Sequence, residues 1–144
     1  MILKSLFSFA LLIIAVAGCK KNDNPAPVDK YPADVANAWM QMQIKLTKST
    51  PGYNSVVSNR SFGYTGIAMY EALLPGMQGY RSLLPQIGGT AIATDKNPDQ
   101  YYWPASVNAA MASITRSFFE NASTAAKASI DSLELAYTTK FQGE

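Results

Sequence analysis

Few residues of this chain could do acid–base chemistry, and Glu71 is the most informative of them. It interrupts the apolar run Ile67–Leu74, which we expect to be helical. A buried carboxylate needs a hydrogen-bonding or charged partner, and Arg81 lies just beyond the Pro75–Gly79 turn. We therefore predict an ion pair between Glu71 and Arg81 that holds this turn to the end of the helix. A general acid or base role for Glu71 has less support, because no second titratable group is near it in the sequence.

The composition excludes several classes of catalytic site. The chain of 144 residues contains no histidine, so it cannot hold a Ser-His-Asp triad, a histidine general base or a histidine-ligated metal. Gly88-Gly89-Thr90 lacks the Gly-Lys-Ser/Thr ending of a phosphate-binding loop and the strand before it. The net charge of +2 argues against nucleic acid as a partner. We expect no catalytic, cofactor-binding or metal-binding residue in this chain.

Cys19 is the only cysteine, so no disulfide can form within the chain. It follows the basic Lys4, the apolar run Leu6–Ala17 and the small residue Gly18, which together are typical of an export signal. Val16-Ala17-Gly18-Cys19 resembles the lipobox of bacterial lipoproteins, in which the cysteine becomes the lipid-bearing first residue. The resemblance implies lipidation at Cys19 and a place in the bacterial cell envelope, on the periplasmic side or in the outer membrane. The alternative is an ordinary signal peptide followed by a chance cysteine.

We predict three segments: a lipoprotein signal peptide at 1–18, a tether at 19–32 and a helical domain at 33–144. Removal of the signal peptide leaves 11 basic and 10 acidic residues, a net charge of +1. Lys20–Pro32 is polar, contains three prolines and shows no apolar period, as expected of a tether.

The domain is predicted to be all-α, because apolar residues recur at helical spacing and no stretch shows a sustained strand pattern. We expect a long loop over residues 82–100, with at most a short helical turn near Ser82–Leu84, which could cover a neighbouring surface. The helices are expected at about Ala33–Lys48, Ser58–Leu74, Pro104–Asn121 and Ser123–Phe141. The predicted buried stripe of the first helix is Val35, Trp39, Met42 and Leu46. That of the third is Val107, Met111, Ile114 and Phe118, and that of the fourth is Ala126, Ile130, Leu133, Tyr137 and Phe141.

The second of these helices, Ser58–Leu74, is apolar on every side, and its N-cap is expected at Ser55 or Ser58. A helix that is apolar all round is usually buried all round. We therefore expect it to form the centre of the bundle, and to need more cover than three companion helices supply.

Several motifs of the chain resemble one known superfamily. Over roughly Tyr31–Phe141 the sequence is similar to the N-terminal helical part of bacterial proteins related to vanadium-dependent haloperoxidases and type 2 phosphatidic acid phosphatases. The motifs that carry this resemblance are Ser58–Tyr64, Ala68–Leu73, Gly79–Leu83, Tyr102–Pro104 and Asn108–Ala110.

The resemblance implies a larger helical bundle of which this chain is a part. Members of the superfamily bind phosphate or vanadate through a Lys and an Arg, a Ser-Gly-His, and an Arg with a second His. None of these motifs can be placed here, so no site residue is carried over. Vanadate would be a cofactor only of a full-length parent protein.

Two functional hypotheses follow. In the first, the chain is the N-terminal helical portion of a lipid-anchored acid phosphatase or vanadium haloperoxidase-like protein, inactive alone. Its partners would be the membrane, through the lipid on Cys19, and the C-terminal catalytic bundle of the same parent. In the second, it is a complete small lipid-anchored helical binding module, because four helices can close a core by themselves.

Overall fold

The protein is an all-helical bundle. The computed structural model describes residues 27–92 and 101–142, and this part holds four α-helices, three short 3-10 turns and no strand. The predicted fold class and the number of main helices are confirmed. The elements are η1 (Val28–Lys30), α2 (Asp34–Ser49), α3 (Ser55–Leu73), η2 (Leu74–Gly76), η3 (Leu84–Ile87), α4 (Trp103–Phe118) and α5 (Thr124–Gln142).

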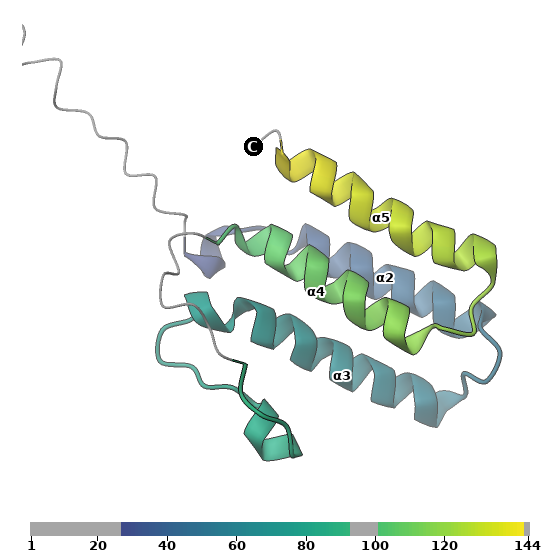
Figure 1. Ribbon diagram of the computed structural model, residues 1–144, viewed down its shortest axis with the longest axis horizontal. Coiled ribbons are helices and arrows are strands. Elements are labelled where there is room, and N and C mark those ends of the chain that lie inside the picture. Colours follow the sequence, from purple (N-terminus) through teal and green to yellow (C-terminus); the bar gives the residue numbers. More distant parts are fainter. Residues whose placement is uncertain (1–26, 93–100, 143–144) are drawn as a thin grey trace, which may run out of the picture.

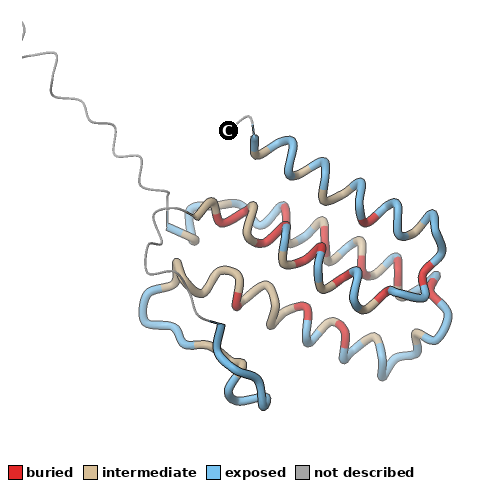
Figure 2. Tube along the Cα trace, viewed as in Figure 1, coloured by how far each residue is buried: buried red, intermediate tan, exposed pale blue. Residues whose placement is uncertain are grey.

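The four helices lie side by side and alternate in direction (Figure 1). Helix α4 is in contact with α2, α3 and α5, and is therefore the hub of the bundle. The buried residues are concentrated on α2 and α4, whereas most of α5 is exposed (Figure 2).

The prediction that α3 forms the centre is wrong. Its fully covered positions are Ser61, Thr65 and Glu71, while Tyr64 is 41% exposed. The apolar residues Phe62, Ile67, Met69 and Leu73, expected to be covered on all sides, are only half-buried. The bundle covers one side of α3, mainly through α4, and leaves the opposite side to a loop and solvent.

Local sequence signals explain where the helices begin. Helix α3 is capped by Asn54, whose Oδ1 accepts a hydrogen bond from the Val57 amide at 3.0 Å, and not by a serine as predicted. Pro104 lies in the first turn of α4, where its missing N–H has no cost. Ser123 Oγ accepts from the Ala126 amide at 3.2 Å at the start of α5.

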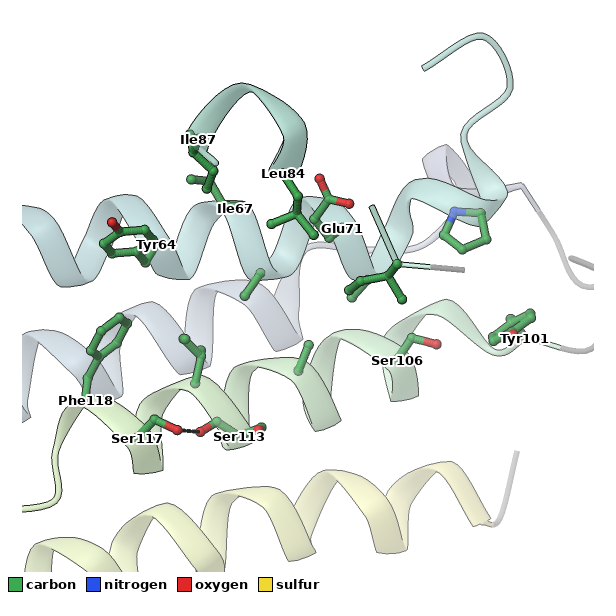
Figure 3. Close-up of a pocket in the computed structure, with 16 residues that line it drawn as sticks. Tyr64, Ile67, Glu71, Leu84, Ile87, Tyr101, Ser106, Ser113, Ser117 and Phe118 are labelled. Atoms are coloured by element: carbon green, nitrogen blue, oxygen red, sulfur yellow. Dashed lines mark hydrogen bonds between the residues drawn. The ribbon is translucent and has the colours of Figure 1, made fainter. Parts of the chain in front are cut away.

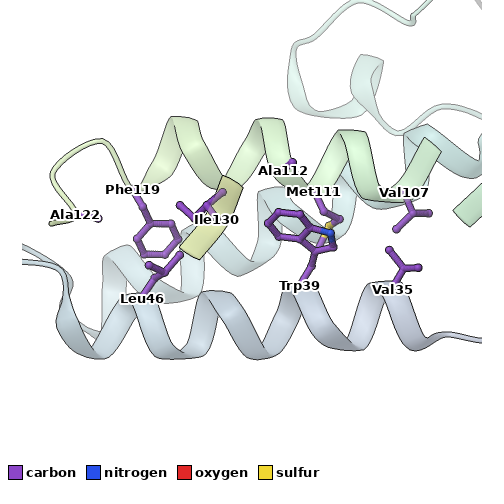
Figure 4. Close-up of a cluster of buried hydrophobic side chains, with 9 residues drawn as sticks. All are labelled: Val35, Trp39, Leu46, Val107, Met111, Ala112, Phe119, Ala122 and Ile130. Carbon is purple, nitrogen blue, oxygen red and sulfur yellow. The ribbon is translucent and has the colours of Figure 1, made fainter. Parts of the chain in front are cut away.

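The hydrophobic core lies between α2, α4 and α5 (Figure 4). Trp39, Met111 and Phe119 are completely buried. Phe119 also stacks on Tyr53 with a centroid separation of 4.5 Å, which ties the α2–α3 connection to the end of α4. The remaining core residues are Val35, Leu46, Val107, Ala112, Ala122 and Ile130.

Buried polar side chains set the register between the helices. Asn108 of α4 accepts from Trp39 Nε1 at 2.8 Å and donates to the Glu134 carbonyl of α5 at 3.0 Å. Such fully paired polar groups favour one alignment of neighbouring helices, because any slip would leave them buried and unpaired.

Candidate functional site

An apolar groove lies between α3 and α4 (Figure 3). Its volume is about 780 Å³, within the range typical of ligand and peptide sites. One wall is α3, the other is α4, and the loop around η3 closes part of the opening. The lining residues are Tyr64, Ile67, Ala68, Glu71, Ala72 and Pro75; Tyr101, Ser106, Ala110, Ser113, Ile114, Ser117 and Phe118; and Leu84, Ile87 and Ile92.

The α4 wall consists largely of small residues. Ser106, Ala110, Ser113 and Ser117 recur at four-three-four spacing and therefore lie on one helical face. Ser117 Oγ donates to the carbonyl of Ser113 at 3.2 Å, so this hydroxyl is already bonded to its own helix (Figure 3). The side chains of this wall are therefore short, and the Ser117 hydroxyl is satisfied within its own helix.

The loop that closes the groove is fastened to α3 by two hydrogen bonds. Glu71 Oε1 accepts from the Leu83 amide at 2.7 Å, and Tyr70 Oη donates to the Arg81 carbonyl at 2.8 Å. At the end of η3 the chain turns at Gly88, whose φ of +82° favours glycine over any residue with a Cβ. Ile87 lies beside Ile67 of α3, and both line the groove (Figure 3).

The predicted ion pair between Glu71 and Arg81 is replaced by another contact. None of the ion pairs among the described residues joins them; those present link Lys30 to Asp29, and Arg116 to both Asp131 and Glu134. The Glu71 carboxylate, 8% exposed, takes its partner from the Leu83 backbone amide. A backbone donor satisfies a buried carboxylate without the cost of bringing a guanidinium out of water. The turn is still held to the end of the helix, by this different donor.

The chemistry available at the groove is limited. Among the described residues that line it, Glu71 is the only carboxylate and none has a basic side chain. These residues can therefore bury apolar surface but supply no acid–base pair. In the part of the chain that the structure describes, no three aspartate, glutamate, cysteine or histidine side chains gather in a way that could hold a metal ion.

Trp103, at the start of α4, is too deeply buried for its ring to stack on a ligand. It is 3% exposed and lies against Gly76, directly after α3.

Cys19 and the expected signal segment lie outside the described residues. Val28–Lys30, inside the segment expected to be a tether, forms the turn η1. None of the helices described is long and apolar enough to cross a bilayer.

Sequence reasoning missed the groove because it assigned Ile114 and Phe118 to the buried core. Both are half-buried and line the groove. The signal that could have revealed it is the small-residue stripe of α4, which lies beside the core stripe and not within it.

No family model, no curated protein and no solved structure matches this chain.

Proposed function

We propose that this chain is the lipid-anchored N-terminal helical part of a protein related to vanadium-dependent haloperoxidases and type 2 phosphatidic acid phosphatases. In this proposal the groove receives an apolar helix from the catalytic bundle of the same parent. The chain contributes packing and support, and the parent contributes the phosphate- or vanadate-binding residues.

The observation that carries the proposal is the groove between α3 and α4. Its lining is almost entirely apolar, and it opens beside Tyr64 and Ile87, which are 41% and 49% exposed. An exposed apolar surface of this kind favours association with another protein element. Small residues along the α4 wall let a helix backbone approach closely, as in other helix-in-groove contacts.

The motif resemblance supports the choice of partner. The segments similar to the superfamily include Ala68–Leu73 of α3 and Asn108–Ala110 of α4, and these contribute Ala68, Ala72 and Ala110 to the groove.

The proposal is tested with the soluble chain lacking residues 1–19. We expect it to dimerise or aggregate through the uncovered groove, as measured by analytical ultracentrifugation. Ile114→Glu should reduce this association because it places a charge among apolar residues. Leu135→Glu is the matched control, since Leu135 is 65% exposed on α5, away from the groove. Equal association of the unmutated chain and both variants would exclude the groove as the contact surface.

Activity and gene structure supply two further tests. The pure chain should show neither phosphomonoester hydrolysis nor halide peroxidation, and turnover by it would refute the division of labour. The frame downstream of Glu144 should encode Ser-Gly-His and Arg-His motifs. A stop codon there would leave the second hypothesis.

That second candidate is a complete binding module for an apolar ligand, and the groove's volume of about 780 Å³ favours it. It predicts a monomer that unfolds cooperatively and binds a fluorescent fatty acid with one-to-one stoichiometry. Ile114→Glu should then abolish probe binding without changing the oligomeric state.

A further inference from the structure

One end of the bundle is rich in tyrosine. Because the helices alternate in direction, this end holds the N-termini of α2 and α4 and the C-termini of α3 and α5 (Figure 1). Six of the eight tyrosines lie within two helical turns of it or in its loops, and we call it the tyrosine end. They are Tyr31, Tyr70, Tyr80, Tyr101, Tyr102 and Tyr137.

Aromatic contacts hold this end together. Tyr102 lies edge-on to Tyr31 at 5.4 Å and to Phe141 at 5.2 Å, and Phe141 stacks on Tyr137 at 5.7 Å. These contacts join the residues before α2 and α4 to the last turns of α5. The rings are half-buried, so they form a fixed surface of aromatic edges instead of a set of freely moving side chains.

The chemistry of this surface suits a lipid–water interface. Tyrosine combines an apolar ring with a polar hydroxyl and is enriched where proteins meet phospholipid headgroups. Tyr80, in the loop after α3, is 64% exposed. At this end Lys30 pairs with Asp29 at 3.6 Å, which offsets its positive charge.

The length of the tether favours the same end. Cys19 precedes Pro27, the first described residue, by eight positions, which reach at most about 29 Å when fully extended. Helix α3, with 19 residues, is itself about 28 Å long. A lipid on Cys19 reaches the tyrosine end with slack, whereas contact of the opposite end with the bilayer would require a nearly straight tether along the whole bundle.

We infer that the tyrosine end rests on the membrane surface at the level of the phospholipid headgroups. This inference rests on the lipid anchor of the proposed function. Helices α3 and α4 then stand away from the bilayer, and the groove between them opens sideways, where a soluble catalytic bundle can enter it.

The test measures which part of the bundle touches lipid. The chain 19–144 is coupled through its only cysteine, Cys19, to a maleimide lipid in phosphatidylcholine vesicles whose acyl chains are brominated near the headgroup. Three single variants place a tryptophan at exposed sites: Tyr80→Trp at the tyrosine end, Val56→Trp at the opposite end, and Ile87→Trp beside the groove. The fluorescence of the native Trp39 and Trp103, recorded with the unmutated chain, is subtracted.

We expect the added tryptophan of Tyr80→Trp to be quenched several-fold more than the other two, with little dependence on salt. Gln78→Trp, in the same loop, replaces it if Tyr80→Trp loses helical circular dichroism. Equal quenching at all three sites, or stronger quenching at Val56→Trp or Ile87→Trp, would overturn the inference.

Failure of this inference can be distinguished from failure of the anchor. The maleimide coupling does not depend on lipidation by cells, so the vesicle result stands by itself. Natural lipidation is measured separately, as incorporation of labelled palmitate in a bacterial host with Cys19→Ser as the control. Absence of label in the native chain would remove the anchor, and with it the premise of the inference.

Discussion

Replacing Gln43 with leucine should weaken the bundle by breaking a bond network shared by three helices. Gln43 Nε2 of α2 donates to Thr115 Oγ1 of α4 at 2.8 Å. The single hydroxyl proton of Thr65 on α3 is shared between Gln43 Oε1 at 3.0 Å and the Ser61 carbonyl at 2.8 Å. All three side chains are completely buried. The amide is therefore the polar link between α2 and both neighbours.

The expected cost follows from these two bonds. A buried intramolecular hydrogen bond contributes about 1 kcal/mol to stability, so loss of the Thr115 bond and of the shared Thr65 bond predicts a decrease in the free energy of unfolding of about 1–2 kcal/mol. Leucine fills nearly the same space, so a cavity adds little. For a small domain whose total stability is about 5–15 kcal/mol, this change is easily measured.

The triple variant Gln43→Leu, Thr65→Val and Thr115→Val separates bonding from packing. It replaces every member of the network by an apolar group of similar shape, which can be nearly neutral. We therefore expect it to recover most of the stability lost by Gln43→Leu alone. Such recovery would identify the Thr115 hydroxyl, which Gln43→Leu leaves without its amide partner, as the main source of the cost.

The assay is urea unfolding followed by circular dichroism, at one protein concentration because the soluble chain is expected to associate. Gln41→Leu, at an exposed position of α2, is the control and should change stability by less than about 0.5 kcal/mol. A triple variant less stable than Gln43→Leu would refute the reasoning.

Two other changes test the packing at the ends of α3. Gly76→Ala would drive a methyl group into the Trp103 ring and should cost about 1–3 kcal/mol in urea unfolding. Gly63→Ala is the control: this glycine, inside α3, has open space around it, so the change should stabilise the helix by up to about 1 kcal/mol. Equal effects of the two changes on stability would contradict this packing. Tyr53 Oη donates to the Phe118 carbonyl at 2.7 Å, and burial raises the pKa of Tyr53. Its contribution is complete below about pH 10, the pKa of an unfolded tyrosine, and is lost as pH rises through the higher folded value. Tyr53→Phe should therefore lose less stability than the parent above pH 10 in thermal melts, and identical slopes would contradict it.

The local sequence was sufficient to predict the helices themselves. Apolar spacing located all four within about three residues at each end. The helical repeat, the helix-ending Pro75 and the helix-starting Pro104 are signals that act over only a few residues. It also identified Val35, Trp39 and Leu46 as buried positions of α2.

The same spacing could not predict which polar groups enter the core. It favoured Met42, whereas Gln43 is the completely buried residue and Met42 is only partly covered. An amide is stable there because hydroxyls from α3 and α4 meet it. Those partners are 22 and 72 residues away in the sequence, so no local pattern contains them.

By itself, the sequence determined that the chain is helical, where each helix lies, and that one carboxylate would need a partner. Tertiary structure alone decided that α4 and not α3 is the hub, that Leu83 and not Arg81 meets Glu71, and that a groove stays open beside α4. The physical reason is that propensity and capping depend on neighbours in the chain. Coverage of a helix depends instead on which distant surfaces reach it, and the other three helices do not cover every side of α3.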